Sequence, residues 1–371
     1  MSQVYIQAGL RSPIGIEGKQ FAKPRPEHLG AELINQLLRQ ALGAIDELIC
    51  GNALGTGGNI GRLMTLYSDL AQTVPAVTLD MQCASAGAAI QTGYANIKAG
   101  LAERVLVGGI ESSSLQPERR YALGDDRQGA YRVAQFSPDF WDSLVMFRGA
   151  QEVAKRYQFT KEDLDSKAFI SHQKAIKAQE EGVLDSLIMS LVNKKDQGIR
   201  AKISQKMLRK IPPILGPKTV ISAGNACLTH DAAAFLILGK EKSAFRICDM
   251  VTLAGDPQKS PLMILKASQE VLKRQKLSMS DIAAIEWNEA FAVMDSLFEH
   301  HFPESLDNYN IFGGALAYGH PFGASAAINV LHLMKALEYK KGRFGLAAIA
   351  AAGGQGFAIL IEYMKGSANN C

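Results

Sequence analysis

One order of elements occurs twice in this chain, and it limits the possible folds more than any other feature. In the first copy a strand-like segment, residues 76–82, leads directly to Cys83. A small-residue helix is expected at 86–100, and a nearly continuous apolar run at 104–110 is typical of a strand buried on both faces. The first copy therefore predicts strand, reactive residue, helix and strand, in that order.

The second copy has His320 where the first has Cys83. Residues 309–319 precede His320, a helix is expected at 323–337, and a strand at 345–354. A duplicated fold would bring the two helix starts together at its centre, so that Cys83 and His320 face one site.

The rest of the chain alternates short apolar runs with amphipathic segments, which indicates α/β layering. Residues 117–216 depart from this alternation and are expected to form a cap. We therefore predict an N-terminal half at 1–116, completed by 217–240, and a C-terminal half at 241–371. The further elements expected are strands at 4–7, 48–49, 77–79, 218–222 and 233–238, and helices at 27–42, 150–157 and 161–180.

Composition excludes several classes of protein. The chain has 371 residues, 47% of them hydrophobic, and a net charge of +4 that does not by itself imply nucleic-acid binding. Its five cysteines include no CxxC pair, so no metal site or disulfide framework is expected, and an odd number fits a reducing cytosol. No apolar run approaches the roughly 20 residues of a membrane span. We expect a cytoplasmic protein.

His320 lies in the glycine-rich segment GGALAYGHPFGASAA at residues 313–327. The glycines allow close approach of backbone, and the helix that follows would direct its first N–H groups at whatever His320 handles. At the start of a helix the pKa of the Cys83 thiol is expected to be lowered, although Cys83 alone could be a small buried hydrophobe. Beside His320 it would be an activated nucleophile.

Two further polar features have open interpretations. Asn288 and Glu289 lie between apolar runs, where they could cap a helix or orient a water or an oxyanion. Basic residues gather at 194–218, either as a solvated surface loop or as a site for a small polyanion. These residues are Lys194, Lys195, Arg200, Lys202, Lys206, Arg209, Lys210 and Lys218.

The chain resembles the thiolases along essentially its whole length. The motifs that carry the resemblance follow the family's order: RSPIG at 11–15, CASAG at 83–87, GGIESSS at 108–114, AGNACLTHDAAA at 223–234, NEAFA at 288–292, GGALAYGHPFGASAA at 313–327 and GGQG at 353–356.

This resemblance implies a thiolase fold, with duplicated βαβαβαββ halves in five αβαβα layers and an inserted loop domain that binds coenzyme A. It also implies a homodimer or homotetramer. Coenzyme A and acyl-CoA would be substrates, with no permanently bound cofactor.

The resemblance also implies a role for each matching residue. Cys83 would be acylated and His320 would take its proton. Asn288 would hold a water that forms one oxyanion hole with His320, and the N–H groups of Cys83 and Ala352 would form the other. Coenzyme A would contact Arg200, Lys202, Ala223, Cys227 and Met146.

The chain departs from the family at several of these positions. The second catalytic cysteine of thiolases, which moves a proton at the α-carbon, is Ala350 here, and Ala352 replaces a glycine. Cys227 replaces a serine beside the pantetheine arm; it could be a substitute acid–base or a buried structural residue. Residues 145–147 lack a histidine that lies near the thioester in the family.

Three functions follow from these residues, in order of preference. The first is a thiolase-like acyltransferase acting on short acyl-CoA or 3-ketoacyl-CoA through an acyl-cysteine, slowed by Ala350. The second is a decarboxylating condensing enzyme, which makes its carbanion by loss of carbon dioxide and so does not need the second cysteine. The third is a non-condensing binder or hydrolase of coenzyme A thioesters.

Overall fold

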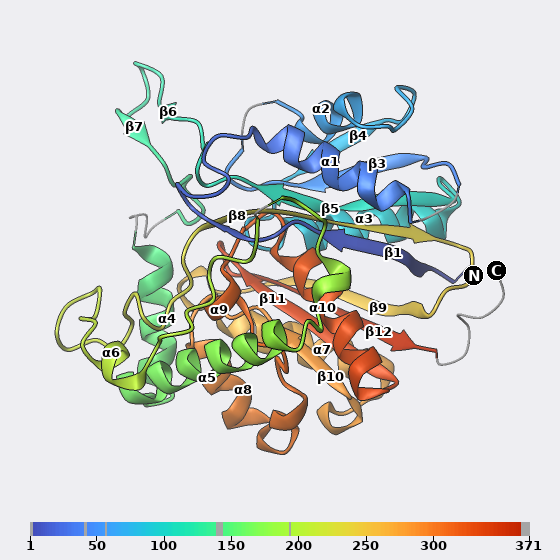
Figure 1. Cartoon of the computed structure of the whole chain (residues 1–371). Helices are drawn as coiled ribbons and strands as arrows, with labels where there is room; N and C mark the ends of the chain where they lie inside the picture. The colour runs from blue at the N-terminus through green and yellow to red at the C-terminus, as the bar shows by residue number, and fades with distance from the viewer. Residues whose placement is uncertain (1–2, 41–42, 56–57, 139–143, 193, 365–371) are drawn as a thin grey trace.

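A path of nine hydrogen-bonded strands organises the described residues, in the order β10-β11-β12-β9-β1-β8-β5-β3-β4 (Figure 1). The computed structural model describes residues 3–40, 43–55, 58–138, 144–192 and 194–364. The strands are β1 (Tyr5–Arg11), β3 (Glu47–Gly51), β4 (Ala76–Leu79), β5 (Arg104–Glu111), β8 (His230–Gly239), β9 (Phe245–Ala254), β10 (Ala284–Trp287), β11 (Phe344–Ala351) and β12 (Gln355–Tyr363), with β2 (Gly15–Ile16) beside β8.

The two halves of this path repeat one pairing scheme, as the duplicated sequence order predicts. In the N-terminal half β3 is parallel to β4 and β5, and β8 is antiparallel to β5 and β1. In the C-terminal half β10 is parallel to β11, and β12 is antiparallel to β11 and β9. A parallel bridge between Ile285 and Tyr309 stands where the first half has β4. A short pairing of β1 with β9 joins the halves.

Helices separate and cover the two halves of this path, which we call the N-terminal sheet (β1, β3, β4, β5 and β8) and the C-terminal sheet (β9 to β12), giving five layers. α3 and α10 pack against each other, and α10 contacts strands of both sheets, which explains why most of its surface is buried. α1 and α2 cover the outer face of the N-terminal sheet, and α7 lies on β9, β11 and β12 with α8 beside it (Figure 1). None of the helices in the described ranges is long and apolar enough to cross a membrane. The bounds are α1 (Pro26–Leu38), α2 (Ile60–Tyr67), α3 (Ser85–Ala99), α7 (Leu262–Gln275), α8 (Val293–His301), α9 (Ala315–Tyr318) and α10 (Ser325–Lys340), with short 3₁₀ turns at Asp185–Leu187, Pro257–Lys259, Met279–Asp281 and Pro303–Asn308.

The segment between β5 and β8 forms the insertion. A small hairpin, β6 (Arg119–Arg120) and β7 (Ala130–Tyr131), projects from the body of the molecule, and α4 (Val145–Arg156), α5 (Lys161–Glu180) and α6 (Gln205–Arg209) follow it (Figure 1). The strand expected at 218–222 is wrong. Its backbone N–H groups are taken by side chains instead: Val220 N–H donates to Gln151 Oε1 and Ser222 N–H to Asn225 Oδ1.

Backbone packs directly on backbone where the central helices begin. A Cβ placed on Gly109 of β5 would lie 1.9 Å from the carbonyl oxygen of Gly323, just ahead of α10. A Cβ on Gly51 of β3 would lie 2.5 Å from the backbone nitrogen of Ala86 in α3. Only glycine permits these approaches, which hold both helix starts against the N-terminal sheet.

Candidate active site

A tight turn between β4 and α3 presents Cys83. Gln82 adopts a left-handed conformation with φ 51°, and Ser85 Oγ donates to Gln82 O at 2.6 Å while it accepts from Met81 N–H at 2.9 Å. Cys83 is 9% exposed, at the entrance to α3. Cys83 therefore lies at a helix start, as the sequence predicts.

The electrostatic surroundings of Cys83 differ from those expected at a helix start. Burial raises the pKa of the Cys83 thiol to about 12, and the charges of Glu111 and Asp80 add to this effect. The N–H groups of Ala352 and of Cys83 itself lower the pKa but do not offset burial. The expectation that the helix start lowers the thiol pKa is thus wrong for the free protein, whose Cys83 is a neutral thiol.

The hydrogen bonds of His320 determine which of its ring nitrogens carries the proton. Ser325 Oγ donates to Pro321 O at 2.8 Å, so its one hydrogen is used. The 2.6 Å contact between Ser325 Oγ and His320 Nδ1 must then be donated by Nδ1–H. Nε2 therefore keeps its lone pair, and it has no partner among the described residues although His320 is only 1% exposed. This is the protonation state that a general base requires.

The environment of His320 keeps the ring neutral. Burial lowers the pKa of His320 to about 3, because a charged ring would lose its hydration, and the nearby His230 lowers the pKa further. His230 is close because its ring packs against Gly319, where a Cβ would lie 2.3 Å from the ring. The resting site therefore pairs a neutral thiol with a neutral imidazole.

Cys83 and His320 line one cavity of ≈ 480 Å³. Three other predicted site residues, Ala352, Cys227 and Met146, line it as well. Sequence reasoning missed much of the remaining wall. The missed residues include four aromatic and two basic side chains: Phe136, Phe147, Phe291, Phe322, Arg119 and Arg132.

The hairpin supplies the two arginines of this wall. Arg132 pairs with Glu17 at 2.9 Å, and Arg119 reaches the carbonyl of Gly55 at 3.5 Å. Tyr121 and Tyr131 stack across the hairpin with ring centroids 4.3 Å apart. The rise of charged and aromatic residues after position 116 was the available signal for this wall, but it did not say which side chains face the cavity.

Asn288 lies outside this cavity. Its backbone N–H donates to Ala348 O at 3.0 Å, which continues the pairing of β10 with β11, and its side chain lines a cavity of ≈ 10 Å³ beside Gly319 and Ser325. Asn288 Nδ2 is buried and has no partner among the described residues. The neighbouring Glu289 is structural, because its carboxylate accepts from Ser171, Asn310 and Leu316.

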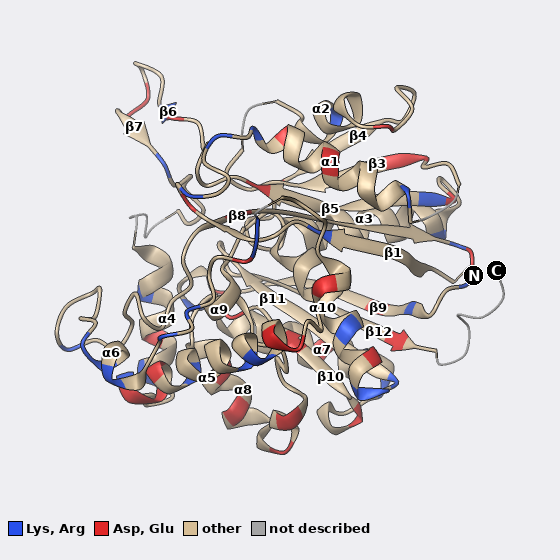
Figure 2. Cartoon of the chain, in the orientation of Figure 1, with Lys and Arg blue, Asp and Glu red and all other residues tan. Residues whose placement is uncertain are grey.

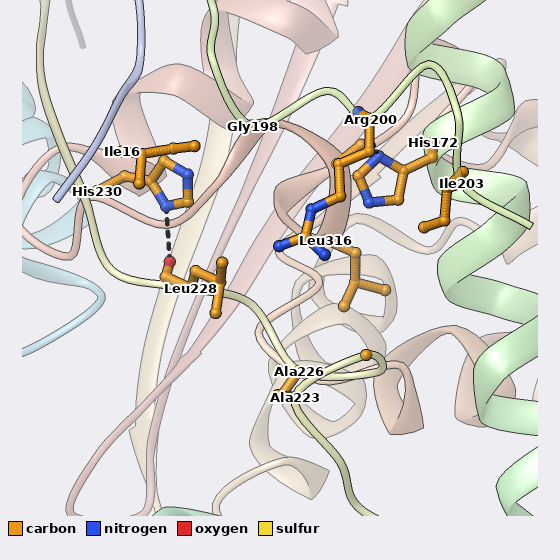
Figure 3. Close-up of a pocket in the computed structure, with 12 residues that line it drawn as sticks. Ile16, His172, Gly198, Arg200, Ile203, Ala223, Ala226, Leu228, His230 and Leu316 are labelled. Carbon is orange, nitrogen blue, oxygen red and sulfur yellow. Dashed lines mark hydrogen bonds between the residues drawn. The ribbon is translucent and has the colours of Figure 1, made fainter. Parts of the chain in front are cut away.

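Arg200 and Lys202, the basic residues predicted to meet coenzyme A, lie in the loop before α6, and Lys206 and Arg209 lie on α6 itself, beside α5 (Figure 2). Arg200 lines a separate cavity of ≈ 20 Å³ with His172, His230 and Ala223. Figure 3 shows the Arg200 side chain between the two histidine rings. The backbone N–H of Arg200 donates to His172 Nδ1 at 3.2 Å. This cavity has room for about one water molecule. A phosphate would have to bind the outer side of the exposed Arg200 guanidinium.

Ala350 is buried near the end of β11, where it lies opposite Gly356 of β12. Two residues further on, Ala352 lines the cavity and directs its N–H at the Cys83 sulfur. The methyl group of Ala350 has no proton to transfer, so nothing at this position can act as acid or base.

Comparison with known proteins agrees with this architecture. Residues 4–242 match the model of the thiolase N-terminal domain, and residues 241–363 match that of the thiolase C-terminal domain. A probable acetyl-CoA acyltransferase of Staphylococcus aureus is 31% identical over 98% of this chain and 100% of its own length.

Solved structures agree as well. The acetyl-CoA acetyltransferase of Bacillus anthracis superposes with a TM-score of 0.88 at 27% identity, over 98% of this chain and 99% of that one. The Acat5 thiolase of Ascaris suum, solved in complex with coenzyme A, has a TM-score of 0.88 at 28% identity over 98% and 100% of the two chains. The chain has the α/β thiolase fold and belongs to the thiolase family of acyltransferases.

Proposed function

We propose that this protein transfers acyl groups between coenzyme A thioesters through an acyl-Cys83 intermediate, acting on short acyl-CoA or 3-ketoacyl-CoA. One observation carries the proposal: the Cys83 thiol and the unpartnered Nε2 of His320 line the same cavity. Cysteine with a neutral imidazole base is a standard arrangement for acyl transfer.

Because Cys83 and His320 are both neutral before substrate binds, proton transfer between them cannot precede attack on the substrate. With the pKa of Cys83 near 12 and that of His320 near 3, a thiolate–imidazolium pair is unfavourable before substrate binds. Proton transfer from the Cys83 sulfur to His320 Nε2 therefore accompanies attack on the substrate carbonyl. The N–H groups of Ala352 and Cys83 already lie at the sulfur and would stabilise the oxyanion that forms.

The cavity wall supports a thioester with a short acyl group. Phe147 and Phe291 pack edge to face with ring centroids 5.5 Å apart, and Met146 lies beside them. An apolar wall with a few polar groups is usual for small-molecule sites. The coenzyme A complex of the Ascaris thiolase supports coenzyme A as the carrier. The phosphates of coenzyme A would bind Arg200 and Lys202, and its pantetheine arm would lie along Ala223 and Cys227.

Asn288 would act from the separate small cavity that Gly319 and Ser325 also line. A water held by its unpartnered Nδ2 would complete an oxyanion hole with His320 once substrate binding connects this cavity with the main one.

We also infer assembly into a homodimer or homotetramer. The family resemblance carries this inference, and the hairpin that projects from the body exposes Leu123, which a second copy of the chain would cover. Light scattering coupled to gel filtration tests this part of the proposal.

The decisive assay mixes the protein with acetoacetyl-CoA and free coenzyme A and follows loss of the enolate absorbance. Turnover that disappears in Cys83→Ala is the expected result. Equal rates for wild type and Cys83→Ala would contradict the proposal.

Ala350 favours one second candidate, decarboxylative condensation, because loss of carbon dioxide from a malonyl thioester creates the carbanion without proton removal. Release of carbon dioxide from malonyl-CoA with acetyl-CoA as primer distinguishes this reaction. No release above the Cys83→Ala background removes it.

A further inference from the structure

The proposed reaction needs a second proton carrier, which Ala350 cannot be. When the bond between the α-carbon and the keto carbon breaks, the departing fragment is a carbanion that must take a proton. His320 holds the proton received from Cys83 and is engaged at the sulfur. A group with a transferable proton must therefore face the α-carbon from elsewhere in the wall.

Few described residues of the wall can meet this requirement. Its titratable side chains are Glu17, Cys83, Arg119, Arg132, Cys227 and His320. Arginine does not release a proton in proteins. Glu17 accepts hydrogen bonds from Thr229 and Arg132, which lower its pKa, so it is ionised at neutral pH and has no proton to give. Cys227 remains.

Backbone hydrogen bonds hold the Cys227 segment between the loop of residues 288–292 and the loop that carries His320. Cys227 N–H donates to Ala290 O at 3.0 Å, and the neighbouring Ala226 forms a bridge with Phe291. On the other side, Thr229 forms a bridge with His320, and Leu228 O accepts from His320 N–H at 3.3 Å.

The protonation of Cys227 suits an acid. Burial raises the pKa of the Cys227 thiol, so the thiol keeps its proton in the free protein and can donate it to a carbanion.

We propose that Cys227 is the second acid–base of this site, in place of a cysteine at position 350. In thiolysis the carbon–carbon bond breaks, and the carbanion takes the proton from the Cys227 sulfur. The incoming coenzyme A thiol then gives its proton to the Cys227 thiolate as its own sulfur attacks acyl-Cys83. In condensation the same steps run in reverse. This inference rests on the proposed acyl-Cys83 chemistry.

The test separates α-carbon chemistry from acylation. Wild type and Cys227→Ala are incubated with acetyl-CoA in deuterium oxide. Deuterium uptake into the acetyl methyl group measures proton transfer at carbon, and mass spectrometry of Cys83 measures acylation. We expect Cys227→Ala to lose exchange by roughly 10²–10⁴ while Cys83 is still acetylated. Cys227→Ser, which keeps the size of the side chain but not an ionisable thiol, should lose exchange equally.

Two further variants exclude a merely structural effect. Cys248→Ala changes a half-buried cysteine of β9 that is absent from the cavity wall, so it should exchange at the wild-type rate. Adding Ala350→Cys to Cys227→Ala should restore exchange, because it returns a thiol to the position of the family's second catalytic cysteine.

Exchange in Cys227→Ala that equals the Cys248→Ala control overturns the role of Cys227 and leaves the proposed function intact. Wild-type protein that never acetylates Cys83 overturns both.

Discussion

His320 Nδ1 lies 2.6 Å from Ser325 Oγ, and this contact determines that Nε2 is the basic nitrogen. Toward Nδ1 the Ser325 hydroxyl can act only as an acceptor, because its own hydrogen is donated to Pro321 O. Ser325→Ala would leave a buried Nδ1–H without a partner and free the ring to change tautomer. We expect the rate of Cys83 acylation to fall about tenfold, equivalent to about 1.4 kcal/mol.

Ser268 provides the matched control for this change. It is a buried helical serine whose hydroxyl also donates to the carbonyl four residues earlier, but it lies in α7, away from the cavity. Rapid-quench measurement of acetyl-Cys83 should show the loss in Ser325→Ala alone. A similar loss in Ser268→Ala would mean that the effect is general destabilisation.

Asn288→Ala tests whether the unpartnered Asn288 amide in the small cavity contributes to catalysis. Loss of an oxyanion-hole group typically costs roughly 10²–10³ in kcat. A thermal melt should show no loss of stability, because Asn288 Nδ2 has no protein partner to lose among the described residues. Asn329 lines the same small cavity with an unpartnered amide, so Asn329→Ala is the control and should keep its kcat. Equal kcat for Asn288→Ala and wild type would assign Asn288 a packing role.

The raised pKa of the buried Glu111 carboxyl group predicts that the stability of the protein depends on pH. Burial raises the pKa of Glu111 from 4.5 to about 7, against hydrogen bonds from the N–H groups of Ala53, Leu54 and Gly323. A raised carboxyl pKa means that the folded state favours the protonated form. The stability that this group contributes is therefore complete below pH 4.5 and is lost as pH rises through 7, by about 3 kcal/mol in total.

Glu111→Gln removes this titration. Urea unfolding at pH 5 and pH 7.5 should show that wild type loses stability relative to Glu111→Gln as pH rises. Glu103→Gln, at a mostly exposed glutamate that pairs with Lys240, should follow the wild-type curve. Parallel curves for wild type and Glu111→Gln would exclude a raised pKa at Glu111.

Gly109→Ala should be among the most damaging single-methyl changes in the chain. The added Cβ would lie 1.9 Å from the carbonyl of Gly323, so strand β5 or the start of α10 must move, at a cost of about 3 kcal/mol or more. Gly124→Ala adds the same methyl group where no atom lies within 4 Å. Chemical unfolding should place Gly124→Ala near wild type; if Gly109→Ala lies there too, the close backbone contact is not rigid.

The sequence was sufficient for those features that local patterns encode. Apolar runs and small-residue helices predicted both halves, and from the repeat it followed that Cys83 and His320 would share a site. The ionisation of Cys83 could not be predicted in this way, because its pKa depends on burial by elements distant in sequence. Local helix geometry alone gave the opposite direction.

The irregular segments were beyond pattern reasoning for a different reason. The apolar run at 218–222 has strand-like composition, but the side chains of Gln151 and Asn225 accept hydrogen bonds from its backbone N–H groups. No pattern in the sequence indicates these two hydrogen bonds. Likewise Arg119 and Arg132, from the hairpin segment, line the same cavity as Cys83 only because the folded chain brings the two segments together. Such contacts are tertiary and have no periodic signature.

The two helix starts that meet at the centre of the molecule belong to different halves of the duplicated chain. Cys83 comes from one half and His320 from the other, so neither half alone holds the pair that we propose to be catalytic. During refolding, the proposed activity can return only after both halves have folded and docked. Recovery of activity should therefore lag behind recovery of helical signal whenever docking is the slower step.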